Sequence, residues 1–449
     1  MAKGVQALVG RVSGMVTIAR ALPGQKRVPF RDREQLLEDR DRRVRETVSY
    51  AVEHVPYYRE LFVRGEIDPR EIRTADDLTS LPLVGRDEVL PEARQFRSVA
   101  PGTRDGIELQ SSGTTGVPLR LFHDRRSVLR NVAYAERERA VESALVGKRL
   151  RYTRMYLGSG FTENVDRVRG LMARASFRPF RPTFRRASLG GKPEGVYRTI
   201  DSIKPDVIMG CGSHLESFFR AAVERGGPTH RPKALLYTWD QMTARGRRLI
   251  EEHFGIPVIS RYSAMESLKI GYVCERRGGF HLHEDLCHVT IADPDGVEVP
   301  DGQPGEIVLS NLVNRGTVLL RYRIGDLGRI STETCTCGRS SRVLADLEGR
   351  ATEYIPLLDG DNVGPLRVTM AVGQVPGIVR YQLVQRTPSA FELRLETADR
   401  NVFDLGAAAA VAAVRKILPG YEVEVTYAET VVPEPRRKYR PIVLLDTAP

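Results

Sequence analysis

Serine, threonine and glycine residues alternate in one short stretch between two apolar segments. Residues 109–121 have the sequence Leu-Gln-Ser-Ser-Gly-Thr-Thr-Gly-Val-Pro-Leu-Arg-Leu. Glycine lets the backbone turn so that successive N–H groups converge, and hydroxyl groups add neutral hydrogen-bond donors for phosphate oxygens. The stretch predicts a phosphate cradle, with an ordinary flexible turn as the alternative interpretation. The predicted cradle residues are Ser111, Ser112, Gly113, Thr114, Thr115 and Gly116.

The cradle differs from the P-loop of nucleotide hydrolases. That loop has a lysine and a serine or threonine after its second glycine, which reach the outer phosphates and magnesium. Here Val117 and Pro118 follow Gly116. The phosphate must therefore be held in a different way.

Three further segments follow the cradle in a fixed order. Tyr262–Glu266 (Tyr-Ser-Ala-Met-Glu) and Tyr322–Asp326 (Tyr-Arg-Ile-Gly-Asp) each come after a strand-like segment, and Gly349 and Arg350 stand at the start of a linker. Together with the cradle, these segments resemble the signature series of the adenylate-forming superfamily, which contains acyl-CoA synthetases, luciferases and adenylation domains. The resemblance covers nearly the whole chain.

Within that superfamily the chain looks most like the phenylacetate-CoA ligase branch. The features in common are a short chain, the Val-Pro-Tyr-Tyr-Arg sequence at 55–59, the Leu-Pro-Leu sequence at 81–83 before Arg86, and an insertion that carries cysteines.

The resemblance implies a role for each segment. Activating a carboxylate requires bringing it against the α-phosphorus of ATP, holding pyrophosphate as the leaving group, and neutralising the developing charge. Glu266 is expected to bind Mg²⁺, Asp326 to accept hydrogen bonds from the ribose hydroxyls, and Arg350 to add positive charge beside them. Tyr262 and Ser263 complete the expected nucleotide site. The alternative interpretation is that Glu266 begins a surface helix, Asp326 lies in a common turn and Arg350 is a solvated linker residue.

A basic run near the C-terminus, Arg436–Arg440, contains Lys438. In the family, a lysine at this place contacts the α-phosphate and the substrate carboxylate during adenylation, so Lys438 is expected to be catalytic together with Glu266 and Thr114. The usual preceding glycine is Arg437 here, and a solvated basic run is the alternative.

Two other segments depart from the family pattern. Glu353 stands in for the usual acidic hinge residue, which puts the domain rotation and the coenzyme A tunnel in doubt. The adenine-contacting motif is replaced by Tyr237–Gln241, which includes the only tryptophan, Trp239. Trp239 is expected in the nucleotide or acyl pocket, where it would form an apolar wall, or else to pack under the sheet. The expected substrate-pocket residues are Gly210, Ser213, Trp239 and Ala264.

Cysteine and histidine residues form a separate candidate metal site. Cys274, His281, Cys335 and Cys337 would supply three thiolates and one imidazole, enough for a closed tetrahedral structural Zn²⁺ site. Because alternate residues of an extended chain share a face, His283 or Cys287 could replace one of these ligands. The alternative is four reduced side chains that pack independently.

Composition limits the class of protein. The chain has 449 residues, 41% hydrophobic residues, five cysteines and a net charge of +11. An odd number of cysteines without a signal peptide predicts a reducing, cytoplasmic location, and no charge-free stretch is long enough for a membrane span. The positive charge favours polyanionic ligands such as ATP or coenzyme A. Nucleic acid is disfavoured, because no recognition motif with stacking aromatic residues is present.

Apolar periodicity predicts the organisation of the chain. Residues 31–66 favour a helix that ends near Pro56, and the N-terminal 20 residues favour a packed first helix, with a surface-docking amphipathic helix as the alternative. Short apolar runs alternate with helical stretches from about residue 107, which is typical of a layered α/β domain. We expect an α/β fold with three segments: a helical N-terminal part of the large domain (1–105), an adenylate-forming core with a β-rich subdomain (106–350), and a small mobile α+β C-terminal domain (351–449).

These features together predict an ATP-dependent enzyme that converts a carboxylic acid, expected to be aryl or aryl-acetic, to an acyl-adenylate. Transfer to coenzyme A as a thioester is expected next. One alternative is the same adenylation with an amine, a hydroxyl or a carrier-protein thiol as acceptor. Another is a non-catalytic binding protein on the same fold. The expected partners are the acid, ATP and the acceptor, and the chain could also form a homodimer.

Overall fold

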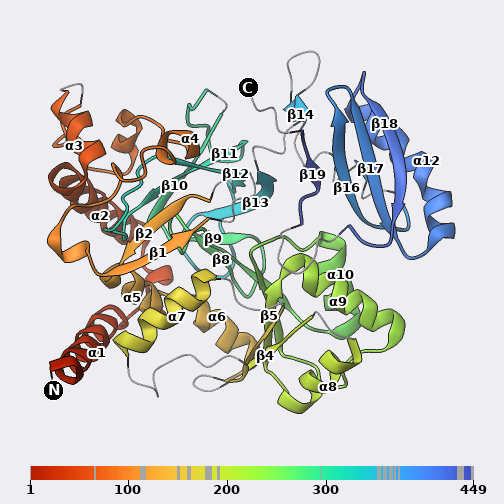
Figure 1. Ribbon diagram of the computed structural model, residues 1–449, viewed down its shortest axis with the longest axis horizontal. Helices are drawn as coiled ribbons and strands as arrows, with labels where there is room; N and C mark the ends of the chain where they lie inside the picture. Colours follow the sequence, from red (N-terminus) through yellow and green to blue (C-terminus); the bar gives the residue numbers. More distant parts are fainter. Residues whose placement is uncertain are drawn as a thin grey trace. The chain divides into compact units, whose positions relative to one another are not determined.

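The computed structural model describes most of the chain, and these residues divide into two compact units. The first unit is Met1–Ile324 with Arg329–Ala345, and the second is Gly325–Gly328 with Asp346–Pro449. The expected α/β class is confirmed (Figure 1). The described residues are 2–64, 67–111, 118–148, 152–158, 163–176, 185–189, 193–293, 295–350, 355–356, 362–363, 368, 371–372, 375–431 and 439–445.

The first unit begins with helices. The helix expected to end near Pro56 does end there, and a second helix follows it directly; the two are divided at Val55, which is extended (φ −116°, ψ 115°). The division follows from Pro56, because a proline disfavours the helical conformation in the residue before it. The helical elements of this part are α1 (Ala2–Ala21), η1 (Val28–Phe30), α2 (Arg33–His54), α3 (Pro56–Val63), η2 (Asp76–Ser80), α4 (Arg86–Val89) and η3 (Pro101–Thr103).

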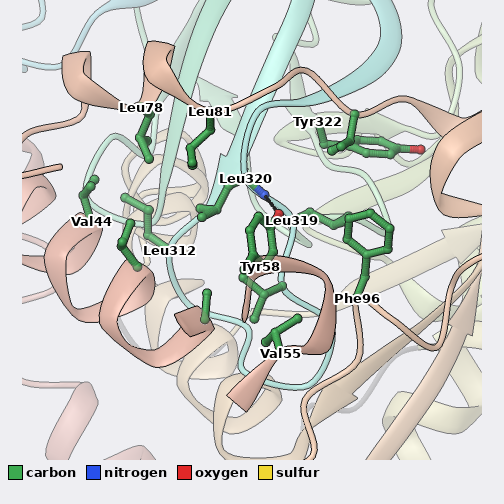
Figure 2. Packing of buried hydrophobic residues seen from close by; sticks show 14 of the residues in the cluster. Val44, Val55, Tyr58, Leu78, Leu81, Phe96, Leu312, Leu319, Leu320 and Tyr322 are labelled. Atoms are coloured by element: carbon green, nitrogen blue, oxygen red, sulfur yellow. Dashed lines mark hydrogen bonds between the residues drawn. The ribbon is translucent and has the colours of Figure 1, made fainter. Parts of the chain in front are cut away.

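A hydrophobic cluster joins these helices to a distant part of the chain (Figure 2). Tyr58 on α3 is 1% exposed and packs edge-on near Phe96. Its hydroxyl oxygen accepts a hydrogen bond of 2.8 Å from the backbone N–H of Leu320, and burial raises the pKa of this hydroxyl. The N-terminal helices are thereby fixed to the segment that leads into the Tyr322–Asp326 motif.

A β-hairpin precedes the main sheet. Strands β1 (Gly106–Gln110) and β2 (Arg120–Asp124) pair antiparallel, with Leu109 opposite Leu121. The carboxylate of Asp124 accepts a hydrogen bond from the N–H of Ser127 and so caps the next helix. The helices that follow are α5 (Arg125–Tyr134), α6 (Glu136–Val146) and α7 (Glu163–Ala175).

The main sheet of eleven strands has the order β10-β11-β12-β13-β9-β8-β7-β6-β5-β3-β4. The last five strands of this order, β7-β6-β5-β3-β4, are parallel. Helices α8 (Pro193–Ile203), α9 (Gly212–Arg225) and α10 (Ala244–Phe254) connect consecutive strands from β4 to β7 along the chain. The parallel strands are β3 (Arg154–Leu157), β4 (Arg185–Ala187), β5 (Val207–Cys211), β6 (Ala234–Thr238) and β7 (Val258–Tyr262). Because the carboxyl ends of parallel strands meet at one edge, Gly210, Trp239 and Ser263 are brought to the same edge of the sheet.

The remainder of the sheet begins with an antiparallel β7–β8 pair and is rich in hairpins. It corresponds to the β-rich subdomain expected within residues 106–350. Its strands are β8 (Gly271–Val273), β9 (Phe280–Leu282), β10 (Cys287–Ala292), β11 (Pro304–Asn311), β12 (Tyr322–Ile330) and β13 (Val343–Arg350).

The second unit has its own hydrophobic core. A sheet of order β18-β17-β16-β19 packs against α12 (Arg400–Ile417), and apolar residues such as Leu383, Leu393 and Val414 are fully buried between them. Its strands are β14 (Ile355–Pro356), β15 (Asn362–Val363), β16 (Ile378–Thr387), β17 (Ala390–Thr397), β18 (Glu422–Ala428) and β19 (Ile442–Val443).

Among the helices of the described residues, none combines the length and the apolar character needed to cross a bilayer.

Replacing Tyr58 with phenylalanine is expected to lower the free energy of unfolding by about 1–3 kcal/mol, because the buried N–H of Leu320 loses its acceptor. Urea denaturation would measure the change. Tyr57→Phe is the matched control, since the Tyr57 ring stacks on Phe96 at 4.2 Å and keeps that contact without its hydroxyl. Equal stabilities of the wild-type and Tyr58→Phe proteins would contradict this account of the cluster.

Candidate active site

The predicted cradle connects the two strands of the β1–β2 hairpin. The N–H of Ser111 donates to the carbonyl of Leu119 at 2.9 Å, and the N–H of Leu119 donates to the Ser111 hydroxyl oxygen at 3.0 Å. Arg86 also donates to this oxygen, at 3.3 Å. The Ser111 side chain therefore closes the base of the loop. The other predicted cradle residues, Ser112, Gly113, Thr114, Thr115 and Gly116, lie outside the described residues.

Glu266 lies in a tight turn directly after β7. The N–H groups of Ser267 and Leu268 both donate to the carbonyl of Ala264, at 3.2 and 2.7 Å, and Leu268 has a positive φ of 66°. The Glu266 residue is only 9% exposed, and its carbonyl accepts a hydrogen bond of 2.7 Å from the Asn311 side-chain amide. Residues 264–268 therefore form a hydrogen-bonded turn in which Glu266 is buried, and not the surface helix start that was the alternative.

A histidine from the hairpin contacts the same turn. Nε2 of His123 on β2 lies 2.8 Å from the carbonyl oxygen of Met265. Burial lowers the pKa of His123 to about 4, so the ring is neutral at neutral pH. Since a carbonyl only accepts, Nε2 carries the proton and donates it to this hydrogen bond.

An asparagine on α7 links the hairpin and the turn a second time. Oδ1 of Asn164 accepts from the N–H of Gln110 at 2.9 Å, and Nδ2 donates to the Gln110 carbonyl at 2.6 Å. Nδ2 also lies 3.3 Å from the sulfur of Met265. One side chain therefore contacts both the residue before Ser111 and the residue before Glu266.

A buried ionic network anchors the chain beyond the turn. The ammonium of Lys269 lies 2.7 Å from Glu138 on α6, and Nε2 of His283 lies 3.3 Å from the same carboxylate. Burial alone would raise the pKa of Glu138, but the charges of Lys269 and Arg261 hold it well below its usual value. The carboxylate therefore stays charged and restrains the backbone three residues after Glu266.

The predicted pocket residues gather at the carboxyl edge of the parallel strands, but in two different roles. The Ser213 hydroxyl donates to the carboxylate of Asp240, and its N–H donates to the same group at 3.2 Å, so Ser213 holds the loop that contains Trp239. A Cβ atom at Gly210 would lie 2.6 Å from the carbonyl oxygen of Leu157 on the neighbouring strand. Only glycine fits this close strand packing. Contacts within the protein therefore account for both residues.

Trp239 has an unusual backbone conformation for a large residue. Its φ is 76°, and its ring packs edge-on against Tyr156 at 5.6 Å and an interplanar angle of 80°. Trp239 is half-buried. The strained backbone is held by the surrounding loop, and such strain is found where position matters to function. Ala264, at the next strand end, is half-buried as well.

The remaining predicted nucleotide residues have varied surroundings. Tyr262 is 6% exposed, with its ring 6.1 Å from that of Phe280, whereas Ser263 is exposed. Asp326 is half-buried on β12 after Gly325, whose φ is 80°. Arg350 ends β13, and its side chain is outside the described part of the structure, as is the whole of Lys438.

The four predicted metal ligands come together in the first unit. The ligand atoms of Cys274, His281, Cys335 and Cys337 all lie within 4.8 Å of one another. The sulfurs of Cys274 and Cys335 are 3.7 Å apart, and the Cys337 sulfur lies 3.3 Å from Nε2 of His281. Tetrahedral zinc with bonds of about 2.3 Å to sulfur requires sulfurs about 3.8 Å apart, so these residues fit a zinc ion.

Neighbouring polar groups orient the metal ligands. Nδ1 of His281 lies 3.3 Å from the Ser341 hydroxyl, which leaves Nε2 facing the sulfurs. Burial raises the pKa of Cys337, but hydrogen bonds from Arg339 bring it below its ordinary value. Arg339 is itself held by Glu275 at 2.7 and 2.9 Å.

Neither of the two substitute ligands considered from the sequence belongs to this cluster. His283 contacts Glu138, and the Cys287 sulfur lies 3.6 Å from the Lys269 carbonyl. The alternation that puts His281 and His283 on one face of an extended chain ends here, because β9 stops at Leu282.

Four restraining residues were not predicted from the sequence: His123, Asn164, Asn311 and Glu138. Each is an isolated polar residue on a different element, without a motif around it. Only the pairing of strands and the packing of α6 and α7 bring these residues to the Glu266 turn.

No family model matches the sequence. A phenylacetate-coenzyme A ligase of Thermus thermophilus is 26% identical over 391 residues, which is 83% of this chain and 84% of the relative. A phenylacetate-coenzyme A ligase of Aromatoleum evansii is 25% identical over 350 residues, covering 76% of each chain. The chain is thus similar to phenylacetate-coenzyme A ligases over about three quarters or more of its length, as the resemblance of its motifs predicts.

Solved structures of the adenylate-forming superfamily share this fold. The 2-hydroxyisobutyryl-CoA ligase in its postadenylation state is 19% identical and superposes with a TM-score of 0.69, covering 91% of this chain and 89% of its own. The amide bond synthetase McbA from Marinactinospora thermotolerans is 15% identical with a TM-score of 0.52, covering 74% and 67%. At these identities the similarity establishes the fold.

Asn164→Ala is expected to lower carboxylate-dependent ATP–pyrophosphate exchange by about tenfold, because the buried polar groups of Gln110 lose their partner and the hairpin loosens from the Glu266 turn. Ser176→Ala is the matched control, since it removes a buried hydrogen bond of 2.7 Å to the Met172 carbonyl near the other end of α7. Equal exchange rates in both variants would show that the Asn164 link is dispensable.

Proposed function

We propose that this chain is an AMP-forming acid–thiol ligase, which activates a carboxylic acid with ATP and passes the acyl group to coenzyme A. The observation that carries the proposal is the double link between the cradle hairpin and the Glu266 turn, through His123 and Asn164. Phenylacetate-CoA ligases matched over most of their length support it.

The roles of the charged groups follow from the chemistry of adenylation. When the acid attacks the α-phosphorus, negative charge passes to the pyrophosphate, which needs donors and cations around it. The cradle hydroxyls and N–H groups, with Thr114 among them, would hold this leaving group. Lys438 would contact the α-phosphate and the acid carboxylate, while Asp326 and Arg350 would bind the ribose side.

Glu266 is the residue that would bind magnesium. Its carboxylate belongs to a restrained turn, and carboxylate oxygens are preferred Mg²⁺ ligands. Magnesium, when bound, would neutralise charge on the phosphate oxygens. The restraint by Asn311 and His123 would keep the carboxylate at a fixed distance from the cradle base.

We assign the acid to the aryl or aryl-acetic class. Support comes from Trp239 and Tyr156, whose rings meet edge-on at the carboxyl ends of β6 and β3. Burial raises the pKa of Tyr156 to about 12, so its hydroxyl stays neutral beside an acid. Rigid aromatic walls favour a flat apolar substrate.

Coenzyme A is the proposed acceptor, and an amine, a hydroxyl or a carrier-protein thiol is the alternative. The sequence feature that distinguishes them, the altered hinge at Glu353, lies outside the described residues. AMP release that depends on coenzyme A would establish the thiol acceptor. Adenylate that is trapped by hydroxylamine but is not consumed by coenzyme A would favour another acceptor.

We propose that the Cys274, His281, Cys335 and Cys337 cluster binds a structural zinc ion. All four ligands are protein side chains, which leaves no open position for chemistry. The ion would join the loop after β8 to the segment between β12 and β13, and so would fix the β-rich part of the first unit.

Pyrophosphate exchange tests the assigned residues. Thr114→Ala with Thr115→Ala, and separately Glu266→Gln, are expected to lower exchange by about a hundredfold or more, since each removes transition-state contacts to the phosphates. Glu252→Gln, at an exposed site on α10, is the matched control. Unchanged exchange in the threonine variant would remove the cradle from the mechanism.

A panel of aromatic, fatty and amino acids in the same assay tests the substrate class. Activity with aryl or aryl-acetic acids is expected. If every active acid were aliphatic, the aryl assignment would be wrong while adenylation would stand; if no acid supported exchange, a non-catalytic binding protein would be the better account.

Metal analysis tests the zinc site. The purified protein is expected to contain one zinc ion per chain, and Cys335→Ser with Cys337→Ser should lose it and lower Tm by roughly 5 °C or more. Cys211→Ser should retain both metal and Tm, because Cys211 lies on β5, away from the cluster. Full zinc content in the double variant, or none in the wild type, would contradict the assignment.

A further inference from the structure

Helix α1 exposes a continuous apolar face. Five aliphatic side chains at helical spacing are 41–61% exposed, although side chains of this kind usually pack inside a protein. They are Val5, Leu8, Val9, Val12 and Val16. Spacings of three and four residues put them on one side of the helix. We call this set the α1 stripe.

The opposite face of α1 is fixed to the first unit. A side chain at Gly14 would lie 2.2 Å from the Ala175 carbonyl, so α1 and α7 are in close contact there. Arg125 on α5 donates to the Gly10 carbonyl, and Ile18 packs on the cluster between α5 and α7. Figure 1 shows α1 beside α7, at the N-terminal end of the chain. The stripe is therefore held facing outward by packing on the other side.

The charge around the stripe has one sign. Residues 1–31 contain six lysines and arginines and no aspartate or glutamate. Arg20 and Arg27 are exposed, whereas Lys26 is paired with Glu136 on α6 at 3.0 Å and Arg31 with Asp39 on α2 at 2.5 Å. The whole chain also has a net charge of +11.

We propose that the α1 stripe docks on the surface of a bilayer that contains anionic lipid. An amphipathic helix with an apolar face, flanking cations and no acids inserts at the level of the headgroups without crossing the membrane. A second copy of this chain fits less well, because it would bring cations of the same sign together. None of the stripe residues is assigned a role in adenylation, so the docking does not depend on the proposed function.

Vesicle sedimentation with the full chain tests the docking. Vesicles of phosphatidylcholine mixed with phosphatidylglycerol should bind the wild type at least about tenfold more tightly than pure phosphatidylcholine, and high salt should weaken the binding. Val9→Glu with Val12→Glu should reduce binding at least about tenfold. Val63→Glu is the matched control, since Val63 on α3 is 79% exposed outside the stripe.

Thermal unfolding and pyrophosphate exchange of the double variant should match the wild type, because both substituted residues are solvent-exposed. The proposal would be overturned if the wild-type protein did not bind anionic vesicles, or if the double variant bound them as tightly as the wild type. If the double variant changed a wild-type dimer to a monomer and neither protein bound vesicles, the stripe would be a self-association surface instead.

Discussion

The proposed adenylation depends on holding together two chain segments about 150 residues apart, the cradle hairpin and the Glu266 turn. The restraint consists of hydrogen bonds to backbone groups, from His123 to Met265 and from Asn311 to Glu266, with Asn164 bonded to Gln110. A buried backbone group without a partner costs about 1–3 kcal/mol, so these contacts favour one arrangement over all others. The position proposed for magnesium depends on this arrangement.

The sheet supplies the framework on which these bonds form. Parallel strands β5, β6 and β7 end at one edge, and their ends carry residues predicted for the substrate pocket and the Glu266 turn. The buried Glu138 carboxylate restrains Lys269 just beyond the turn. Glu138 is charged in the folded state, where its pKa is depressed. Its contribution to the free energy of unfolding is therefore fully present above its ordinary pKa and is lost as the pH falls from there through the lower folded-state pKa.

Residue type and motif order allowed part of the site to be predicted. The four segments indicated the family because they resemble its signature series and follow one another in the same order. The cysteine and histidine set Cys274, His281, Cys335 and Cys337 was chosen by ligand type, and the structure brings these side chains together. The α/β class followed from the alternation of apolar runs with helical stretches.

Other features could not be read from the sequence. Asn164 and His123 are single polar residues whose partners are set by packing between elements distant in the chain. The hydrogen bond from the Ser213 hydroxyl to Asp240 is a contact that only the loop geometry reveals, and the pocket role of Ser213 stays a prediction. The end of the first long helix near Pro56 was predicted, whereas the separate helix α3 that begins at Pro56 was not.

The central claim is that the acid carboxylate attacks the α-phosphorus of ATP. Heavy-oxygen labelling of the acid tests this most directly, because the bond that forms determines where the label goes. With the acid that is active in exchange, ATP and coenzyme A, mass spectrometry of the products should find one labelled oxygen in AMP. Label in inorganic phosphate with release of ADP would mean attack at the γ-phosphorus, and would contradict the account.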